Sequence, residues 1–352
     1  MTLPKDAKIY VAGHRGMVGS AIVRSLQRQG YVNIITRSRQ ELDLIDQKAV
    51  FGFLKVKQPD YLFMAAAMVG GIHANDTLRG QFIYENLAIQ TNIIHGAWLA
   101  GIKRLCFLGS SCIYPRDCPQ PIKEEYLLTG PLEQSNDAYA IAKITGVKMC
   151  ESYNRQYGTK YVSLMPTNLY GPNDTYDLDR SHVLPALLRK VHLAKLGMER
   201  NVSAIRGDEM LHGSIPDSLL SDLGCERDAR GQIVLSDRLA PQTKITVWGT
   251  GNPMREFLYV DDMADACVFV MNSGIGDGIY NVGTSIDVTI RELVTHIMDV
   301  VGFRGEIVFD AAKPDGTPRK LLDVSKLAQS GWCYRTSLRD GIALAYEDFY
   351  RI

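Results

Sequence analysis

The sequence lacks an excess of either charge. Its 352 residues include 39 lysines and arginines against 39 aspartates and glutamates, so the formal net charge is zero. A balanced surface offers no electrostatic attraction to nucleic acid or to anionic lipid. No apolar run approaches the roughly 18 residues that a membrane-spanning helix requires, and the N-terminus lacks the basic start and apolar core of a signal peptide. We therefore expect a cytoplasmic protein that binds neither nucleic acid nor membranes.

Patterns of cysteine and histidine that would indicate cross-links or a metal are also missing. The seven cysteines are odd in number, scattered and without a C-x-x-C pair, which argues against a disulfide framework and against structural zinc. The histidines form no H-x-H or H-E-x-x-H pattern. Since these spacings are the usual signatures of histidine metal ligands, we expect no metal.

The first half of the chain alternates short apolar runs with longer helical patterns. Runs of this kind, bounded by turn residues, are typical of strands buried on both faces of a parallel sheet. Their repetition with helices predicts an α/β fold, a Rossmann-type doubly wound parallel sheet. The predicted strands are 8–13, 33–37, 61–67, 104–111 and 161–167, and the predicted helices are 17–29, 46–56, 80–100 and 137–157.

After about residue 170 this rhythm changes, which predicts a second, smaller mixed α/β domain. We expect one domain over 1–170, to which later segments return, and another mainly over 171–352. A helix is predicted at 182–196. The segment that follows it, 197–243, is too long for an ordinary loop, and we expect a partly structured insertion there. The smaller lobe is expected to contain strands at 244–249, 278–283 and 306–310 and helices at 261–273 and 289–302.

Glycines mark the turn between the first strand and the first helix. The stretch is Gly13-His14-Arg15-Gly16-Met17-Val18-Gly19. Glycine there permits a tight turn and lets backbone N–H groups approach a pyrophosphate, while the helix N-terminus favours negative charge. Ordinary turn and packing glycines can have the same spacing. The position at the start of the first βα unit nevertheless favours a dinucleotide cofactor.

The end of the second predicted strand indicates which dinucleotide binds. A site for NAD would place a carboxylate there to hold the ribose 2′-hydroxyl. The strand instead ends in Thr36-Arg37-Ser38-Arg39, and a guanidinium can form paired hydrogen bonds with a 2′-phosphate. With Arg15 from the glycine turn, Arg37 and Arg39 predict NADP(H). The alternative is that these arginines are only solvated loop charges.

Tyr139 and Lys143 are four residues apart on a predicted helix and so project from one face. We expect the ammonium to stabilise the phenolate and lower the pKa of Tyr139, which would let the pair shuttle a proton. An amphipathic surface helix could show the same spacing. In combination with the glycine turn and with a serine at a strand end, in the sequence Ser110-Ser111-Cys112, the spacing favours catalysis.

Several stretches together resemble the extended short-chain dehydrogenase/reductase family, in particular its GDP-L-fucose synthases. They occur in the family's order over nearly the whole chain, and SSCIYP and SHVLPALLR are specific to this subgroup. The stretches are GHRGMVGSAI (13–22), AAAMVGGIHAN (65–75), FLGSSCIYP (107–115), YAIAK (139–143), MPTNLYGPND (165–174), SHVLPALLRK (181–190), PMREFLYVDDM (253–263) and KPDGTPRKLLD (313–323).

The resemblance implies an NADPH-dependent 3,5-epimerisation and 4-reduction of GDP-4-keto-6-deoxy-D-mannose to GDP-L-fucose by a homodimer. It implies that Ser110 binds the substrate carbonyl, that Tyr139 and Lys143 handle its proton, and that Cys112 and His182 are the epimerisation base and its partner acid. The implied cofactor site extends to Asp43, Leu44, Ala65, Ala66, Ala67, Tyr139, Lys143, Pro166, Asn168, Leu169 and His182. The implied substrate site contains Ser110, Cys112, Asn168, the basic end of SHVLPALLRK with Lys190, Trp248 and Arg255.

Plainer interpretations of these residues stay open. A buried cysteine is usually a packing residue, His182 could cap the following helix, and Trp248 and Arg255 could be a core aromatic and a surface charge. The 197–243 segment is longer than in compact members of the family and leaves the sugar open, so a related GDP-4-keto sugar such as a 6-deoxy-heptose is an alternative substrate for a 4-reductase. A non-catalytic NADPH-binding sensor or scaffold is a more remote alternative.

Overall fold

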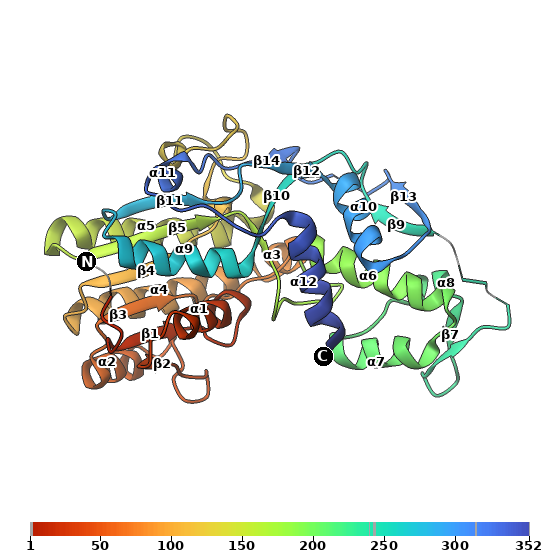
Figure 1. The fold of residues 1–352 in the computed structure, drawn as a ribbon, viewed down its shortest axis with the longest axis horizontal. Coiled ribbons are helices and arrows are strands. Elements are labelled where there is room, and N and C mark those ends of the chain that lie inside the picture. Colours follow the sequence, from red (N-terminus) through yellow and green to blue (C-terminus); the bar gives the residue numbers. More distant parts are fainter. Residues whose placement is uncertain (1–2, 239, 242–243, 314, 352) are drawn as a thin grey trace. The chain divides into compact units, whose positions relative to one another are not determined.

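The computed structural model describes residues 3–238, 240–241, 244–313 and 315–351. The chain folds into two compact units (Figure 1) and passes between them five times. The first unit contains Met1–Asn173, Glu256–Asp287 and Lys320–Thr336, and the second contains Asp174–Arg255, Val288–Arg319 and Ser337–Ile352. No helix within the described ranges is both long enough and apolar enough to cross a membrane.

A six-stranded sheet forms the centre of the first unit. Its strand order is β11-β5-β4-β3-β1-β2, and every pairing in it is parallel. The chain therefore builds outward from β1 in one direction and then returns to its other side, which confirms the predicted doubly wound topology. The strands are β1 (Ile9–Ala12), β2 (Ile34–Ile35), β3 (Tyr61–Met64), β4 (Arg104–Leu108), β5 (Lys160–Pro166) and β11 (Gly278–Val282).

Both faces of this sheet are buried by helices. Ile9 and Val11 of β1 belong to one hydrophobic core, whereas Tyr10 and Ala12, which point the other way, belong to a second. This division follows from the alternation of side chains along a strand. Helices α1 (Met17–Arg28) and α9 (Val260–Ser273) cover the first face, and α2 (Gln47–Lys57), α4 (Arg79–Leu99) and α5 (Asp137–Tyr157) cover the second.

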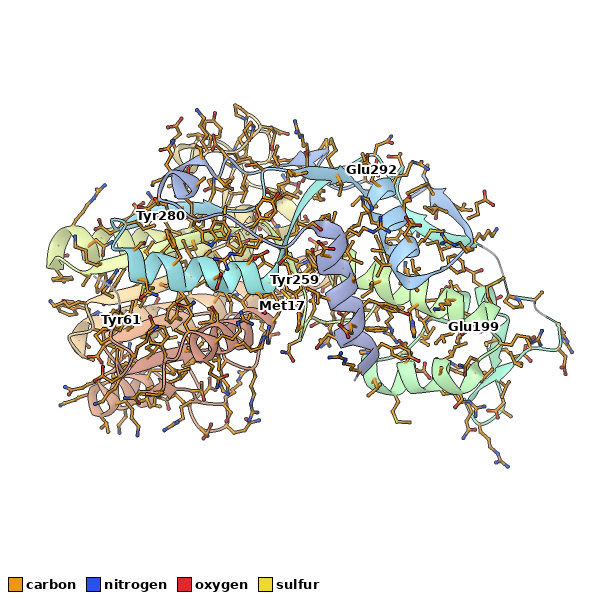
Figure 2. The ribbon with its side chains drawn as sticks, in the orientation of Figure 1. Met17, Tyr61, Glu199, Tyr259, Tyr280 and Glu292 are labelled. Carbon is orange, nitrogen blue, oxygen red and sulfur yellow. The ribbon has the colours of Figure 1, made fainter. Side chains whose placement is uncertain are left out.

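Two elements expected in the smaller lobe belong instead to the first unit. Strand β11 pairs with β5 along its whole length, from Gly278 opposite Val162 to Val282 opposite Pro166. Helix α9 packs against α1, where Asp261 accepts hydrogen bonds from Arg24 and Arg28 at 2.7 and 2.9 Å. Figure 2 labels Tyr280 on β11 and Met17 at the start of α1. The prediction was wrong because local patterns identify a strand but not the sheet edge that it joins.

The second unit combines helices with short strand pairs. Strand β13 lies parallel to β9, and β7 and β8 form an antiparallel pair. The elements are α6 (Val183–Met198), α7 (Val202–His212), α8 (Asp217–Asp222), β7 (Cys225–Arg227), β8 (Ile233–Leu235), β9 (Lys244–Trp248), α10 (Ile290–Val301), β13 (Glu306–Asp310) and α12 (Leu338–Arg351). The remaining α-helices and strands of the described ranges are α3 (Ile72–Thr77), β6 (Asn168–Tyr170), β10 (Met254–Tyr259), β12 (Asp287–Thr289), β14 (Arg319–Lys320) and α11 (Ser325–Gln329).

The 197–243 segment is partly structured, as predicted, although residues 239, 242 and 243 lie outside the described ranges. Its apolar residues, such as Ile205 and Leu220, form a core of their own against α6. Arg189 of α6 ties the segment in place. This side chain is fully buried, donates to Asp208 at 2.8 Å and also donates to the carbonyls of His212 and Gly213. Of the two basic residues that end SHVLPALLRK, Arg189 is therefore committed to the fold and only Lys190 is available for a ligand.

The second unit should lose stability in mild acid because of His192. Its imidazole is buried and lies 3.0 Å from the hydroxyl of Tyr346 on α12. Burial, helped by nearby Lys195 and His212, lowers its pKa to about 4. Since the unfolded chain takes up this proton at a higher pH, folding stability is complete above about pH 6.5 and falls as the pH drops toward 4, by about 2 kcal/mol at pH 5.

Urea unfolding at about pH 7.5 and about pH 5, in wild type and in His192→Gln, measures this effect. The variant should lose less stability between the two pH values than the wild type does. Parallel losses in the two proteins would contradict the assignment to His192.

Candidate active site

The glycine turn after β1 lies at the point where the strand order of the sheet reverses. There the turn meets the segment that follows β3. Gly13 has a φ of +84°, and a Cβ on it would lie 2.6 Å from the backbone nitrogen of Ala66. Glycine is thus required at Gly13 both by its backbone conformation and by this close approach. Because ligands of open α/β sheets bind at such a switch point, the predicted cofactor residues Gly13 and Ala66 stand where a dinucleotide would lie.

The turn itself fits a pyrophosphate. Gly16 precedes α1, and in the part of the chain that the structure describes no side chain caps that helix. Its first N–H groups, beginning at Met17 and Val18, are thus open to an anion. A Cβ on Gly19 would collide with the carbonyl of Gly13, so the third glycine lets the helix pack onto the turn. The buried Nδ1 of His14 finds no partner among the described residues, which is consistent with a polar ligand beside the turn.

The arginines at the end of β2 have a carboxylate beside them that sequence reasoning missed. Glu41 accepts hydrogen bonds from the backbone N–H and the hydroxyl of Ser38, at 2.7 and 2.8 Å. These bonds lower the pKa of Glu41, with a smaller contribution from Arg37 and Arg15. Glu41 therefore shapes the loop that presents the two arginines. Its position three residues beyond Ser38, as in a capping box, was the signal that could have revealed this.

Arg39 and Arg37 are held differently within that loop. The Arg37 guanidinium donates to the carbonyl of Thr36 at 2.6 Å and lies over the ring of Phe53. Arg39 is exposed and lies 3.9 Å from the carboxylates of Asp43 and Glu85, so its charge is partly compensated. Arg37 is therefore the better placed of the two to meet a phosphate.

Buried amides on α4 hold two segments that are predicted from the sequence to bind the cofactor. Asn92 donates to the carbonyls of Leu44 and Ile45 at 3.0 and 2.9 Å. Asn86 both donates to and accepts from the backbone of Met68, directly after Ala65–Ala67. Neither amide was identified as functional from the sequence, because a polar residue in an amphipathic helix is usually expected on the solvent-exposed face.

Ser110 and Cys112 lie together at the carboxyl end of β4. The Ser110 hydroxyl accepts a hydrogen bond from the backbone N–H of Cys112 at 3.3 Å, because Ser110 caps the short 3₁₀ turn Ser111–Ile113. Cys112 is buried. Burial raises the pKa of its thiol, and nearby Lys320, the Ser110 hydroxyl and Lys143 oppose that increase. The thiol is therefore protonated at neutral pH but has cations close by that can stabilise a thiolate.

Tyr139 and Lys143 lie on α5 beside this thiol, as their spacing predicts. The Lys143 ammonium lies 5.7 Å from the centre of the Tyr139 ring and donates to the carbonyl of Leu108 at 2.8 Å. The expected lowering of the phenol pKa is wrong: desolvation raises the pKa of Tyr139, with a further increase from Cys112. Burial also lowers the pKa of Lys143 to about 8. Tyr139 is therefore a protonated phenol, the form required of a proton donor.

Asn168, between Pro166 and Leu169, is fixed by β10. Its side-chain amide donates to the carbonyl of Glu256 at 2.8 Å. Glu256 is fully buried, and its carboxylate accepts hydrogen bonds from the N–H groups of Ser285 and Leu322. Burial raises the pKa of Glu256, while these bonds oppose the change. Asn168 is thus held by the backbone of Glu256, while the carboxylate of Glu256 binds two further segments of the chain.

The second unit holds the other predicted ligand-binding residues. Trp248 is 66% exposed, which excludes the interpretation as a core aromatic. Lys190 and Lys313 lie 5.8 and 5.2 Å from its ring centre. A solvent-exposed aromatic ring with two cations beside it can bind a ligand that is both aromatic and anionic. Sequence reasoning did not assign Lys313, although it opens the stretch KPDGTPRKLLD.

His182 and Arg255 also belong to the second unit. His182 immediately precedes α6. Desolvation lowers the pKa of its imidazole, although the side chain keeps a large exposed fraction that limits the effect. The Arg255 guanidinium donates to the carbonyl of Met254 at 2.8 Å. Burial lowers its pKa against the attraction of Asp315, so Arg255 remains a cation beside one carboxylate.

Similarity to known proteins extends over nearly the whole chain. Residues 9–209 and 227–283 match the NAD dependent epimerase/dehydratase family. GDP-L-fucose synthase 1 of Arabidopsis thaliana is 49% identical over 97% of this chain and 93% of its own, and GDP-L-fucose synthase of Escherichia coli K12 is 47% identical over 97% and 96%. A solved GDP-mannoheptose C4 reductase of Campylobacter jejuni with NADP bound has a TM-score of 0.83 and 40% identity over 99% of this chain and 100% of its own.

Proposed function

Since the chain belongs to the NAD dependent epimerase/dehydratase family, we propose that it converts GDP-4-keto-6-deoxy-D-mannose to GDP-L-fucose by 3,5-epimerisation and NADPH-dependent 4-reduction. The similarity to two GDP-L-fucose synthases over nearly the whole chain supports this activity. The observation that carries it is the Cys112 thiol beside Tyr139 and Lys143. A reductase needs the phenol and the ammonium, whereas the thiol adds a group for epimerisation. The intact set also argues against a non-catalytic sensor.

The first unit is the NADP(H)-binding domain in this proposal. The glycine turn holds the pyrophosphate, Arg37 and Arg15 hold the 2′-phosphate, and the Ala65–Ala67 and Pro166–Leu169 segments line the nicotinamide half. When bound, NADPH supplies the hydride for C4. The NADP-bound reductase of similar fold supports the choice of cofactor.

Reduction at C4 requires a proton for the carbonyl oxygen, and Tyr139 donates it. Its raised pKa keeps the phenol protonated until the oxygen acquires charge. The Ser110 hydroxyl donates a hydrogen bond to the same oxygen and orients the ketone. Lys143 holds the end of β4 through the Leu108 carbonyl, and its charge stabilises the phenolate that remains after proton transfer.

Epimerisation requires one group to remove a proton and a second to return one from the opposite face. We assign these roles to Cys112 and His182. Burial raises the pKa of the Cys112 thiol and desolvation lowers the pKa of the His182 imidazole. Cys112 must therefore lose its own proton before it removes one from C3 or C5, and His182 must gain a proton before it returns one to the opposite face. Ser110 and Tyr139 stabilise the enolate that forms when C3 or C5 loses its proton.

The second unit is the substrate-binding domain and takes the GDP group. Trp248 provides a face for the guanine, and Lys190, Lys313 and Arg255 provide cations for the diphosphate. Asn168 is assigned to the substrate as well, as the resemblance implies. A lysine at 190 binds phosphate as a point charge rather than through paired hydrogen bonds.

A homodimer in the cytoplasm completes the proposal. Helices α4 and α5 pack against each other and carry exposed apolar residues, among them Tyr84 and Ile141. Pairing of these two helices with their symmetry mates would form a four-helix interface.

Incubation with GDP-4-keto-6-deoxy-D-mannose tests the proposed function. In D₂O without NADPH the enzyme should incorporate deuterium at C3 and C5, and with NADPH it should oxidise the cofactor and form GDP-L-fucose, identified by NMR. Reduction without deuterium exchange would contradict epimerisation. It would favour a plain C4 reductase, such as the heptose enzyme of similar fold. No turnover with any 4-keto nucleotide sugar would favour a sensor.

A further inference from the structure

Arg79, the first residue of α4, binds the segment that opens α5. Its Nη2 lies 2.6 Å from the carboxylate of Asp137, and its Nη1 donates to the carbonyl of Gln134 at 2.7 Å. Asp76, in the short helix just before α4, lies 3.5 Å from the same guanidinium. One side chain thus joins the end of the loop that follows β3 to the start of the helix that carries Tyr139.

The start of α5 has no side-chain cap in the part of the chain that the structure describes. The residue before it, Asn136, makes no capping bond within the described ranges, although such a bond usually holds the first N–H groups of a helix. Asp137 is the first residue of α5 and Tyr139 lies in the same turn. Phe82 of α4 also contacts this turn, since its ring meets that of Tyr139 edge to face with the ring centroids 6.3 Å apart. The start of α4 therefore supports both the backbone and the ring of the catalytic turn.

The ion pair between Arg79 and Asp137 matters more for the position of the first turn of α5 than for the free energy of unfolding. It borders an open hollow of about 510 Å³, and the side chains of Arg79 and Asp137 are 43% and 31% exposed. An exposed pair of this kind contributes little to the free energy of unfolding. Its two short hydrogen bonds nevertheless fix the direction in which the first turn of α5 points.

We propose that Arg79 is a positioning residue for Tyr139: by clamping Asp137 and the Gln134 carbonyl, it aligns the phenol with the oxygen that receives its proton. The inference rests on the proposed function, since it needs Tyr139 as the proton donor. Small misalignments of a catalytic group have large effects on rate, whereas ground-state binding of either substrate involves other residues.

The experiment compares Arg79→Met and Arg79→Lys with wild type in steady-state reduction. Arg79→Met should lower kcat about tenfold, as expected for a displaced proton donor, and leave KM for NADPH and for the nucleotide sugar within about twofold. The kinetic isotope effect with NADPH deuterated at the transferred hydrogen should increase, because chemistry becomes slower relative to product release. Arg79→Lys should recover part of kcat, since an ammonium can still bind Asp137.

Arg28→Met is the matched control. Arg28 is another partly exposed arginine of the first unit, and its ion pair with Asp261, at 2.9 Å, does not involve α5. The Arg28→Met enzyme should keep the kcat of wild type. Its melting temperature should be close to that of the Arg79→Met enzyme. Unchanged kcat in Arg79→Met, an equal loss in Arg28→Met, or an unchanged isotope effect would overturn the inference. If wild type makes no GDP-L-fucose, the proposed function fails separately, and any 4-keto nucleotide sugar that oxidises NADPH can replace the substrate in this test.

Discussion

Tyr139→Phe lowers the rate of C4 reduction by about a thousandfold, the contribution expected of a positioned general acid. The substitution removes only the hydroxyl and keeps the ring that packs edge to face on Phe82. The oxygen at C4 must then take its proton from water. Single-turnover loss of NADPH absorbance measures the rate, and binding of NADPH should stay near that of wild type.

Tyr153→Phe provides the control for this result. Tyr153 lies on the same helix, and its hydroxyl lies 2.7 Å from Nδ1 of His95, away from the β4 end that holds Ser110 and Cys112. Its loss should leave the reduction rate unchanged. A Tyr139→Phe enzyme that reduces within tenfold of wild type would show that another group supplies the proton, with Cys112 the nearest alternative.

Cys112→Ser is expected to lower deuterium exchange at C3 and C5 by at least about a hundredfold, since general acid–base groups contribute at least that much. A serine fits the buried position, but its hydroxyl ionises far less readily than a thiol. Reduction should continue, because Ser110, Tyr139 and Lys143 remain. The product should then be a GDP-6-deoxyhexose that keeps the substrate configuration at C3, C5 or both, as determined by NMR.

The exposed Cys333 supplies the comparison, and Cys333→Ser should behave as wild type. Full epimerisation by Cys112→Ser would remove the thiol from the mechanism and leave it a packing residue. Loss of both exchange and reduction would instead indicate that the sulfur supports the geometry of the Ser110 turn. The two outcomes differ in the rate of C4 reduction, so a single preparation of the Cys112→Ser enzyme distinguishes them.

Local patterns in the sequence were enough to place most elements of the fold. The helices at Met17–Arg28 and Asp137–Tyr157 and the strand at Glu306–Asp310 lie within one residue of their predicted bounds, because glycine turns and apolar periodicity are local signals. The membership of β11 in the first sheet depends instead on pairing with β5 over a hundred residues away. Helix α12 was not predicted at all, although one of its faces is buried against the second unit.

In the candidate site, too, some features follow from local sequence and others depend on the folded chain. Spacing placed Tyr139 and Lys143 together, and the resemblance placed Ser110 and Cys112 beside them, as the structure has it. The protonation of Tyr139 could not be predicted, because it follows from burial, which raises the pKa of the phenol and depends on atoms from the whole first unit. Glu41, Asn86 and Arg79 were missed for a related reason: each acts through a backbone or a carboxylate that only folding brings near.

The repeated passage of the chain between its two units constrains how the protein can be divided. A fragment that ends at Asn173 would lack β11 and α9, which leaves the backbone of β5 without a partner on one side and part of an apolar sheet face open to water. Unpaired strand edges of this kind recruit other chains. A chimaera that exchanges the whole second unit would therefore have to graft three separate stretches at once.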